Sequence, residues 1–246
     1  MPGTRVVPAA LVTALRNARS VCVLTGAGIS AESGVPTFRD AQTGFWQRFK
    51  AEDLATPEAF RRDPALIWRW YRWRRELVRQ AQPNAGHLAL AKLGSLLPRL
   101  TLITQNVDGL HQRAGSTAVT EFHGNIFADR CFVEGRIVAC DSDADVPRCP
   151  ACGSHVRPGV VWFGEAIPQQ ALDTAFATAS ACDAFLSVGT SSLVYPAAGL
   201  AEIAAAAGAV VAEINPQPTH LAANIDFAIA APAGVALPEL VDSLSR

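Results

Sequence analysis

The stretch VCVLTGAGISAESG, residues 21–34, joins an apolar run to a glycine-rich turn. Its first part, Val21-Cys22-Val23-Leu24, has the length and aliphatic composition of a strand that is buried on both faces. Gly26 and Gly28 follow directly, where glycines let backbone N–H groups approach a phosphate and open a helix N-terminus towards it. The third glycine of the dinucleotide pattern is absent, because Ala31 stands at that spacing. By itself, this stretch predicts only a nucleotide site.

Three further apolar runs resemble this strand, at residues 100–103, 184–188 and 210–215. Helical patterns lie between the runs, at residues 85–97, 169–180 and 197–207. Apolar strands that alternate with helices are typical of a parallel sheet covered on both faces. The sequence therefore predicts an α/β, doubly wound, Rossmann-like fold, with ligands at the carboxyl ends of the strands.

Two stretches break this alternation. Residues 38–84 are rich in Trp, Phe and Arg and read as helices without a strand. Residues 125–160 hold most of the cysteines. We interpret 1–246 as one unit in which these two stretches form a smaller inserted module, part helical and part zinc-ribbon-like. The larger domain then comprises about residues 1–37, 85–124 and 161–246.

The composition excludes several classes of protein. Half of the residues are hydrophobic and the net charge is −1, which gives no basic surface for nucleic acid. The longest apolar run, around residues 201–212, contains Glu202 and is too short to span a bilayer. We expect a monomer that binds neither nucleic acid nor membrane.

The N-terminal segment allows two interpretations. Residues 1–31 carry three arginines and no acidic residue, as transit peptides do. However, residues 9–18 also read as a first helix that leads into the first strand, and the domain needs that helix. We expect an uncleaved helix and a cytoplasmic protein, with a mitochondrial location as the alternative for a eukaryotic source. The six cysteines are too few for a disulfide scaffold of this length.

A series of further segments changes what the glycine-rich turn means. Residues 26–40 read GAGISAESGVPTFRD. They are followed by TQNVDGLH at 104–111, EFHG at 121–124, VWFGE at 161–165, GTS at 189–191 and INP at 214–216. In this order and at these spacings the segments resemble the sirtuins, from about residue 20 to the end. The resemblance implies an enzyme that consumes NAD to remove acyl groups from protein lysines, releasing nicotinamide, 2′-O-acyl-ADP-ribose and free lysine.

The resemblance assigns the central chemistry to His123 and Asn106. His123 is the general base for a ribose hydroxyl, and an imidazole with a pKa near 6.5 suits that task. Asn106 and Asp108 resemble the pair that forms the nicotinamide pocket and orients the ribose, and Gln105 would hydrogen-bond the ribose. A preorganised polar pocket stabilises the positive charge that develops on the sugar. The alternative is a strand-end loop in which Asn106 and Asp108 are turn formers.

The other NAD contacts are also implied by the resemblance. Phe38 would shield the reacting ribose, and Arg39 would contact the phosphates. Gly189, Thr190 and Ser191 would receive phosphate and the adenosine ribose. The remaining cofactor positions are Gly26, Ala27, Gly28, Ser30, Ala31, Glu32 and Val107, with Asn215, Pro216, Gln217 and Ala233 beside the adenosine.

Residues 68–75, WRWYRWRR, are typical of an amphipathic helix with aromatics in the core and arginines in solvent. Tyr71 and Arg74 are three apart and share one helical face. They match the Tyr-X-X-Arg pair of class III sirtuins, which remove acidic acyl groups. A guanidinium grips a carboxylate bidentately and a phenol adds a third hydrogen bond. We therefore predict that succinyl, malonyl and glutaryl groups are preferred over acetyl.

The segment 161–165 resembles the strand to which the substrate peptide adds by main-chain pairing. We assign substrate contacts there to Val161, Phe163, Gly164 and Glu165, with acylated protein lysines or peptides as the partners. The alternative is an ordinary edge strand.

The cysteines predict one structural zinc. The spacing of Cys149 and Cys152 is that of half a zinc site. Sirtuins carry two such pairs, but here Cys131 is followed by Glu134 where the second cysteine belongs. We predict zinc on Cys131, Cys149 and Cys152, with Cys140, Glu134 or His155 as the fourth ligand. The alternative is a module that has lost its metal and is held by packing.

Two other functions compete with deacylation. A sensor that binds NAD or ADP-ribose without turnover would need no base, so His123, Asn106 and Asp108 argue against it. Mono-ADP-ribosyl transfer shares the first bond-breaking step, and the mass of the products distinguishes the two reactions.

Overall fold

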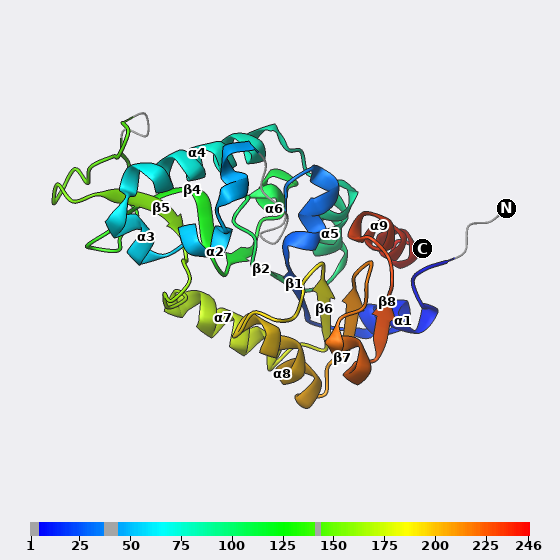
Figure 1. Ribbon diagram of the computed structural model, residues 1–246. Coiled ribbons are helices and arrows are strands. Elements are labelled where there is room, and N and C mark those ends of the chain that lie inside the picture. The colour runs from blue at the N-terminus through cyan, green and yellow to red at the C-terminus, as the bar shows by residue number, and fades with distance from the viewer. Residues whose placement is uncertain (1–4, 37–43, 141–143) are drawn as a thin grey trace.

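The computed structural model describes residues 5–36, 44–140 and 144–246. Its centre is a parallel sheet in the order β3-β2-β1-β6-β7-β8 (Figure 1). The strands are β1 (Val21–Thr25), β2 (Leu100–Thr104), β3 (Val119–Glu121), β6 (Ala184–Val188), β7 (Val210–Ile214) and β8 (Phe227–Ile229). The predicted doubly wound, Rossmann-like fold is confirmed.

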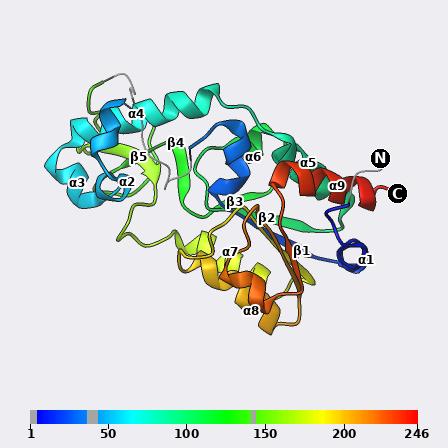
Figure 2. The ribbon, with the colours of Figure 1, turned by 45° about the vertical axis from the view of Figure 1, so that its right-hand side comes forward.

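Helices cover both faces of the sheet (Figures 1 and 2). One face packs against α1 (Ala9–Asn17), α5 (Ala85–Leu96) and α9 (Ala233–Leu244). The other packs against α7 (Gln169–Ala179), the 3-10 turn η3 (Ala197–Gly199) and α8 (Leu200–Ala206). Side chains of β1 alternate between the two layers, with Val23 on the first face and Leu24 on the second. Such a strand must be apolar throughout, which explains the continuous run in the sequence.

The first helix belongs to this core. Leu11 and Leu15 of α1 are fully buried in the layer that α9 and β1 share. Residues of α1 therefore contribute packing to the core beside the sheet.

A small module lies at one end of the molecule, away from α1 and α9 (Figure 2). Its two strands, β4 (Gly124–Cys131) and β5 (Val156–Val160), pair antiparallel. The helical part consists of η2 (Gly44–Arg48), α2 (Ala51–Leu54), α3 (Pro57–Arg62) and α4 (Pro64–Gln80). Phe60, Trp68 and Trp70 from the helices pack with Ile126 and Val156 from the strands as a separate hydrophobic cluster.

Capping residues explain where the module's helices begin. The Thr56 hydroxyl accepts a bond from the Ala59 N–H, and Asp63 does the same for Leu66. Each cap is followed by a proline at the first helical position, where its fixed φ fits and no N–H is missed. The first cap starts α3, and the second starts α4 directly after α3 ends at Arg62.

The structure differs from the sequence-based expectations at several places in the fold. The short strands β3 and β8 were not predicted, since three residues give too little pattern. The helix expected at 197–207 is divided into η3 and α8. Arg75, expected in solvent, is buried and pairs with Asp129 at 2.8 Å. Among the described residues, no helix is long and apolar enough to cross a membrane.

Candidate active site

The loops that follow β1 and β6 meet at the carboxyl edge of the sheet. The Gly28 N–H donates to the Gly189 carbonyl at 2.8 Å. A Cβ at Gly28 would lie 2.7 Å from that carbonyl oxygen, and Gly189 itself has a φ of +60°. Both positions therefore require glycine. The helix expected after these glycines is a short 3-10 helix, η1 (Ala27–Ser33), whereas an α-helix follows in the dinucleotide pattern.

Three buried polar side chains form a network at this edge. The Ser30 hydroxyl donates to Asp108 Oδ2 at 2.8 Å, and Asn106 Nδ2 donates to the Ser30 oxygen at 3.1 Å. The other oxygen of Asp108 accepts from the Leu110 N–H, so Asp108 is a turn former as well. A concentration of buried hydrogen-bonding groups beside glycines at this sheet edge fits a polar ligand such as NAD.

His123 follows β3 and lies beside the loop after β2. Its Nδ1 is 3.0 Å from the Gln105 carbonyl oxygen. A carbonyl can only accept, so Nδ1 carries the proton and Nε2 is left as the basic nitrogen. Burial lowers the pKa of His123, while the bond to Gln105 opposes that shift. The ring is therefore neutral and able to accept a proton at neutral pH.

The far side of the edge is organised around Thr190. Gln105 Nε2 donates to the Thr190 hydroxyl at 3.1 Å, and Asn215 Nδ2 donates to the Thr190 carbonyl at 2.9 Å. Glu32 points elsewhere, because its carboxylate accepts the Gly234 N–H in the first turn of α9, next to Ala233. Thus three of the proposed cofactor loops, after β2, β6 and β7, are joined by side-chain hydrogen bonds.

The remaining cofactor positions are placed as follows. Gly26, Ala27 and Ala31 lie at or within η1, and Val107 accepts the Ile126 N–H through its carbonyl. Ser191 follows Thr190, and Pro216 and Gln217 are exposed beyond Asn215. Phe38 and Arg39 lie outside the described residues.

Two further histidines lie behind the network. His87 completes the capping box of α5 with Asn84. It also lies 3.4 Å from the Ser30 hydroxyl through Nε2, a contact the sequence did not predict. His111 Nε2 is 2.9 Å from the Thr25 hydroxyl, and burial lowers the pKa of His111 to about 3. The ring centroids of the two histidines lie 4.9 Å apart, so His111 extends the buried polar layer that His87 joins to Ser30.

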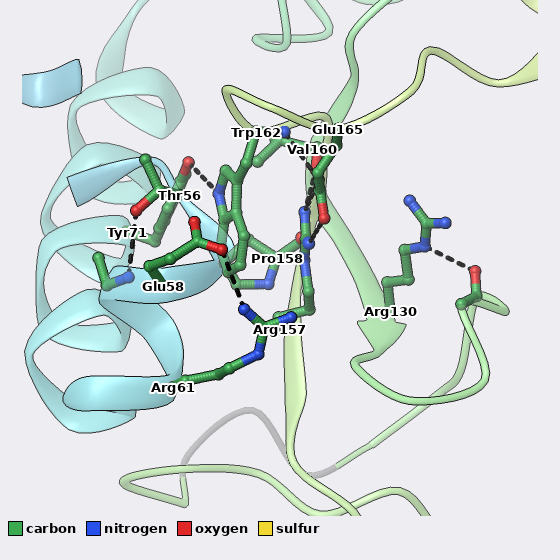
Figure 3. Close-up of polar contacts among 12 residues, drawn as sticks. Thr56, Glu58, Arg61, Tyr71, Arg130, Arg157, Pro158, Val160, Trp162 and Glu165 are labelled. Carbon is green, nitrogen blue, oxygen red and sulfur yellow. Dashed lines mark hydrogen bonds and ion pairs between the residues drawn. The ribbon is translucent and has the colours of Figure 1, made fainter. Parts of the chain in front are cut away.

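Tyr71 and Arg74 lie together on α4. The Tyr71 hydroxyl accepts from Trp162 Nε1 at 2.8 Å (Figure 3). Burial raises the pKa of Tyr71, opposed by the Arg74 charge. Burial lowers the pKa of Arg74, opposed by its interactions with Tyr71 and Asp108. Arg74 thus stands within the electrostatic reach of both the phenol and the polar network of the sheet edge.

The prediction of a strand at 161–165 is wrong. The strand β5 ends at Val160, and the Glu165 N–H turns back to the Trp162 carbonyl at 3.0 Å, with Gly164 at a φ of +82°. The Trp162 N–H bonds the Glu165 carboxylate at 2.9 Å. These bonds fold the chain into a turn, while Val161 bonds the His123 carbonyl and Phe163 bonds that of Ala55.

Arg157 was missed by the sequence analysis. Its side chain is 2% exposed, pairs with Glu165 and donates to the Val160 carbonyl (Figure 3). A buried arginine with paired, hydrogen-bonded neighbours fixes the geometry of what it touches. The signal in the sequence was a single arginine within the apolar strand 156–160.

The cysteine cluster of the module includes Glu134. Ligand atoms of Cys131, Glu134, Cys149 and Cys152 all lie within 4.8 Å of one another. The sulfurs of Cys131 and Cys152 are 3.5 Å apart. Zinc–sulfur bonds of about 2.3 Å in a tetrahedron place sulfurs about 3.8 Å apart, so the group could hold one zinc. Cys140 instead contacts Asp129, and His155 packs edge-on against Phe60.

These features define a class of protein, a Rossmann-like nucleotide-dependent enzyme with a histidine base and a small module beside the site. The Sir2 family model matches residues 26–196, and the chain belongs to this family. An NAD-dependent protein deacylase of Methylococcus capsulatus is 47% identical, with 96% of each chain covered. One of Ralstonia nicotianae is 53% identical over 91% of this chain and 92% of its own.

Solved structures of Sir2 homologues have the same fold as this chain. A Sir2 homologue in complex with NAD superimposes with a TM-score of 0.91 at 42% identity, covering 97% of this chain and 94% of its own. A variant of a Sir2 homologue carries 2′-O-acetyl ADP ribose and matches with a TM-score of 0.90 at 42% identity, with 97% of each chain covered.

Proposed function

We propose that this protein removes acyl groups from protein lysines with NAD as a consumed co-substrate, and that it prefers acidic acyl groups. The observation that carries the deacylase activity is the buried site itself: Ser30, Asn106 and Asp108 in one network, with the neutral His123 beside Gln105. The relatives that bear the name deacylase cover nearly the whole chain, which supports the same assignment.

The residues of the chain have separate tasks in this reaction. NAD, when bound, supplies the ribose carbon to which the acyl oxygen adds as nicotinamide leaves. Asn106 and Asp108 hold the nicotinamide end and orient the ribose in a site that excludes water. His123 Nε2 takes the proton from a ribose hydroxyl, and burial keeps the pKa of His123 below the ordinary value, so the ring is unprotonated and available as the acceptor.

Tyr71 and Arg74 supply the acyl preference. Arg74 is an always-charged fork of donors, and a carboxylate at the end of a succinyl group accepts from it bidentately. The buried Tyr71 phenol stays protonated, because burial raises its pKa, and it can donate another bond. Each hydrogen bond to a charged group contributes about 1.5–3 kcal/mol, and about 1.4 kcal/mol is a factor of ten. Each such contact should therefore favour an acidic acyl group over acetyl by roughly ten- to a hundredfold.

The cysteine cluster is proposed to bind one structural zinc, with Glu134 as the fourth ligand. Of the three candidates, Glu134 is the one that lies with Cys131, Cys149 and Cys152. The cluster joins the turn after β4 to the segment before β5, so the ion would hold the outer end of the module.

The test of the acyl preference compares two arginines of α4. Arg74→Met should reduce turnover of a succinyl-lysine peptide at least tenfold more than turnover of the matched acetyl-lysine peptide. Arg69→Met, an exposed arginine of the same helix, should leave the ratio of the two rates as it is in the unmodified protein. Equal losses on both peptides in Arg74→Met would remove the preference from this residue.

Product masses test the reaction type. Deacylation gives a lighter peptide and acyl-ADP-ribose, whereas mono-ADP-ribosyl transfer gives a protein heavier by ADP-ribose. Nicotinamide release that needs no acyl-peptide, or no release at all, would contradict deacylation.

A further inference from the structure

Trp162 is bonded to Tyr71 of the proposed acyl site. It lies in the turn after β5, whereas Tyr71 lies in the middle of α4. Both side chains are 2% exposed. The Trp162 Nε1–H donates to the Tyr71 hydroxyl at 2.8 Å and joins the two side chains (Figure 3).

The direction of this bond is fixed by chemistry. An indole N–H is only a donor, so the Tyr71 oxygen is the acceptor. A phenol that accepts through its oxygen can still donate its hydrogen, and a bond received at the oxygen strengthens the one that it gives. Trp162 therefore prepares Tyr71 to act as a donor.

The indole ring cannot rotate away from this position. The guanidinium carbon of Arg157 lies 3.4 Å from the centroid of the Trp162 ring, and Phe60 packs at 5.4 Å. Arg157 is held in turn by both carboxylate oxygens of Glu165. The same Glu165 carboxylate accepts the Trp162 N–H at 2.9 Å. Arg157 thus packs on the face of the indole ring, and Glu165 holds the backbone N–H of Trp162.

A donor at this place distinguishes acyl groups. A carboxylate is an acceptor with two oxygens, so a succinyl or malonyl end gains a hydrogen bond from Tyr71. An acetyl group ends in a methyl and gains nothing from the same proton. The direction of one buried bond therefore bears on acyl selectivity.

We infer that Trp162, clamped by Arg157 and Glu165, is a positioning residue that makes the Tyr71 hydroxyl a hydrogen-bond donor to the carboxylate of an acidic acyl-lysine. This inference rests on the proposed acyl preference. Trp162 touches Tyr71 and not the reacting atoms, so its effect should be on binding of the acidic acyl group rather than on the chemical step.

The test measures kcat and KM of Trp162→Phe on matched succinyl- and acetyl-lysine peptides. The change keeps an aromatic ring against Arg157 and Phe60 but removes the N–H. We expect the succinyl-to-acetyl ratio of kcat/KM to fall about five- to tenfold, chiefly through the KM of the succinyl peptide, which is the size of one buried hydrogen bond.

A matched control lies on α4. Trp68 is also fully buried and donates its Nε1–H at 2.8 Å, but to the Val156 carbonyl. Trp68→Phe removes a bond of the same kind and should lower the melting temperature without moving the ratio. A Trp68→Phe variant that lowers the ratio as much as Trp162→Phe would overturn the inference.

Tyr71→Phe completes a double-mutant cycle. When Tyr71 has lost its hydroxyl, Trp162→Phe should change the ratio no further. If the two effects multiply, or if Trp162→Phe retains the unmodified ratio while Tyr71→Phe lowers it, the inference is wrong and the proposed function stands. If the unmodified protein prefers the acetyl peptide, the proposed preference itself fails, and the inference with it.

A spectroscopic readout covers the case in which Trp162→Phe does not fold. In the unmodified protein labelled with ¹⁵N-tryptophan, one indole resonance should move in Tyr71→Phe and on addition of succinyl-lysine peptide, and less with acetyl-lysine peptide. An indole spectrum that responds alike to both peptides would contradict the inference.

Discussion

The sheet edge and the small module both hold polar groups in a buried site, but different interactions position these groups. At the edge, the loops after β1, β2 and β6 come together because parallel strands place their carboxyl ends side by side. In the module, Tyr71 and Trp162 are brought together from α4 and a turn by a buried ion pair and aromatic packing. The order of the parallel strands places the loops of the edge, whereas side-chain packing and an ion pair place the polar groups of the module.

This difference has consequences for mutation. A change at the edge should alter the reaction on every acyl substrate, whereas a change in the module should alter which acyl group is preferred or how firmly the module is held. The following predictions test that division, starting with the largest effect.

His123→Ala should reduce deacylation of every acyl peptide about 10²- to 10⁴-fold, because the base for the ribose hydroxyl is lost. Nicotinamide release and peptide mass measure this loss. The control is His220→Ala, at the exposed first residue of the 3-10 helix η4 (His220–Asn224), which should retain activity. Loss confined to succinyl peptides would place His123 in acyl recognition and break the division.

Gly28→Ala should raise the KM for NAD about tenfold or more and lower the melting temperature. The new Cβ would lie 2.7 Å from the Gly189 carbonyl, and overpacking of this kind costs about 1–3 kcal/mol. Gly94→Ala is the opposite case, since nothing lies within 4 Å of a Cβ there and the position is inside α5. It should stabilise the protein by about 0.5–1 kcal/mol. Calorimetry and NAD titration distinguish the two.

Glu134→Ala should weaken zinc retention in the module and leave the sheet intact. Competition with a chelator, followed by metal analysis, should show faster loss than in Glu58→Ala, an exposed glutamate of α3. Hydrogen exchange should then rise in β4 and β5 but not in β1 and β6. Unchanged metal retention would exclude Glu134 as the fourth ligand.

The smallest effect is on pH dependence. Burial lowers the pKa of His123, so this base stays unprotonated when the pH falls somewhat below 6.5. We therefore expect kcat/KM to remain near its maximum at pH 6.5 and to fall only when the pH decreases to the lowered pKa of His123.

The free energy of unfolding should also decrease as the pH falls, because of His111. His111, with a pKa of about 3 when folded and about 6.5 when unfolded, contributes stability that is complete above pH 6.5 and is lost as pH falls towards 3. The slope is at most about 1.4 kcal/mol per pH unit for one histidine. Urea unfolding should show a shallower decline in His111→Asn, and an equal decline would contradict this origin.

The sequence predicted the edge much better than the module. Continuous apolar strands and the ordered motifs around Gly28, Asn106 and His123 identify the sheet and its ligand edge, because local pattern determines both. The partners of Tyr71 could not be found this way, since Trp162 is 91 residues distant in the chain and no periodicity connects them. The prediction of a strand at 161–165 was wrong for a similar reason. Glu165 turns the chain because its carboxylate binds Arg157 and the Trp162 N–H.

The fourth metal ligand lay between these cases. The sequence limited the choice to Cys140, Glu134 and His155, and only the packing of the module brings Glu134 to the three cysteines. The spacing of two complete Cys-X-X-Cys pairs identifies all four zinc ligands. When one cysteine is replaced, the spacing alone cannot decide which residue is the fourth ligand.

The most direct test of the account is one competition reaction. Equal amounts of succinyl-lysine and acetyl-lysine peptide, identical in sequence, are incubated with the protein and NAD, and the masses of peptides and ADP-ribose products are followed in time. We predict that the succinyl peptide is consumed first, at least tenfold faster, with succinyl-ADP-ribose and nicotinamide as products, and that consumption of both peptides depends on NAD. Faster consumption of the acetyl peptide would contradict the acyl preference, and ADP-ribose attached to protein without acyl loss would contradict deacylation.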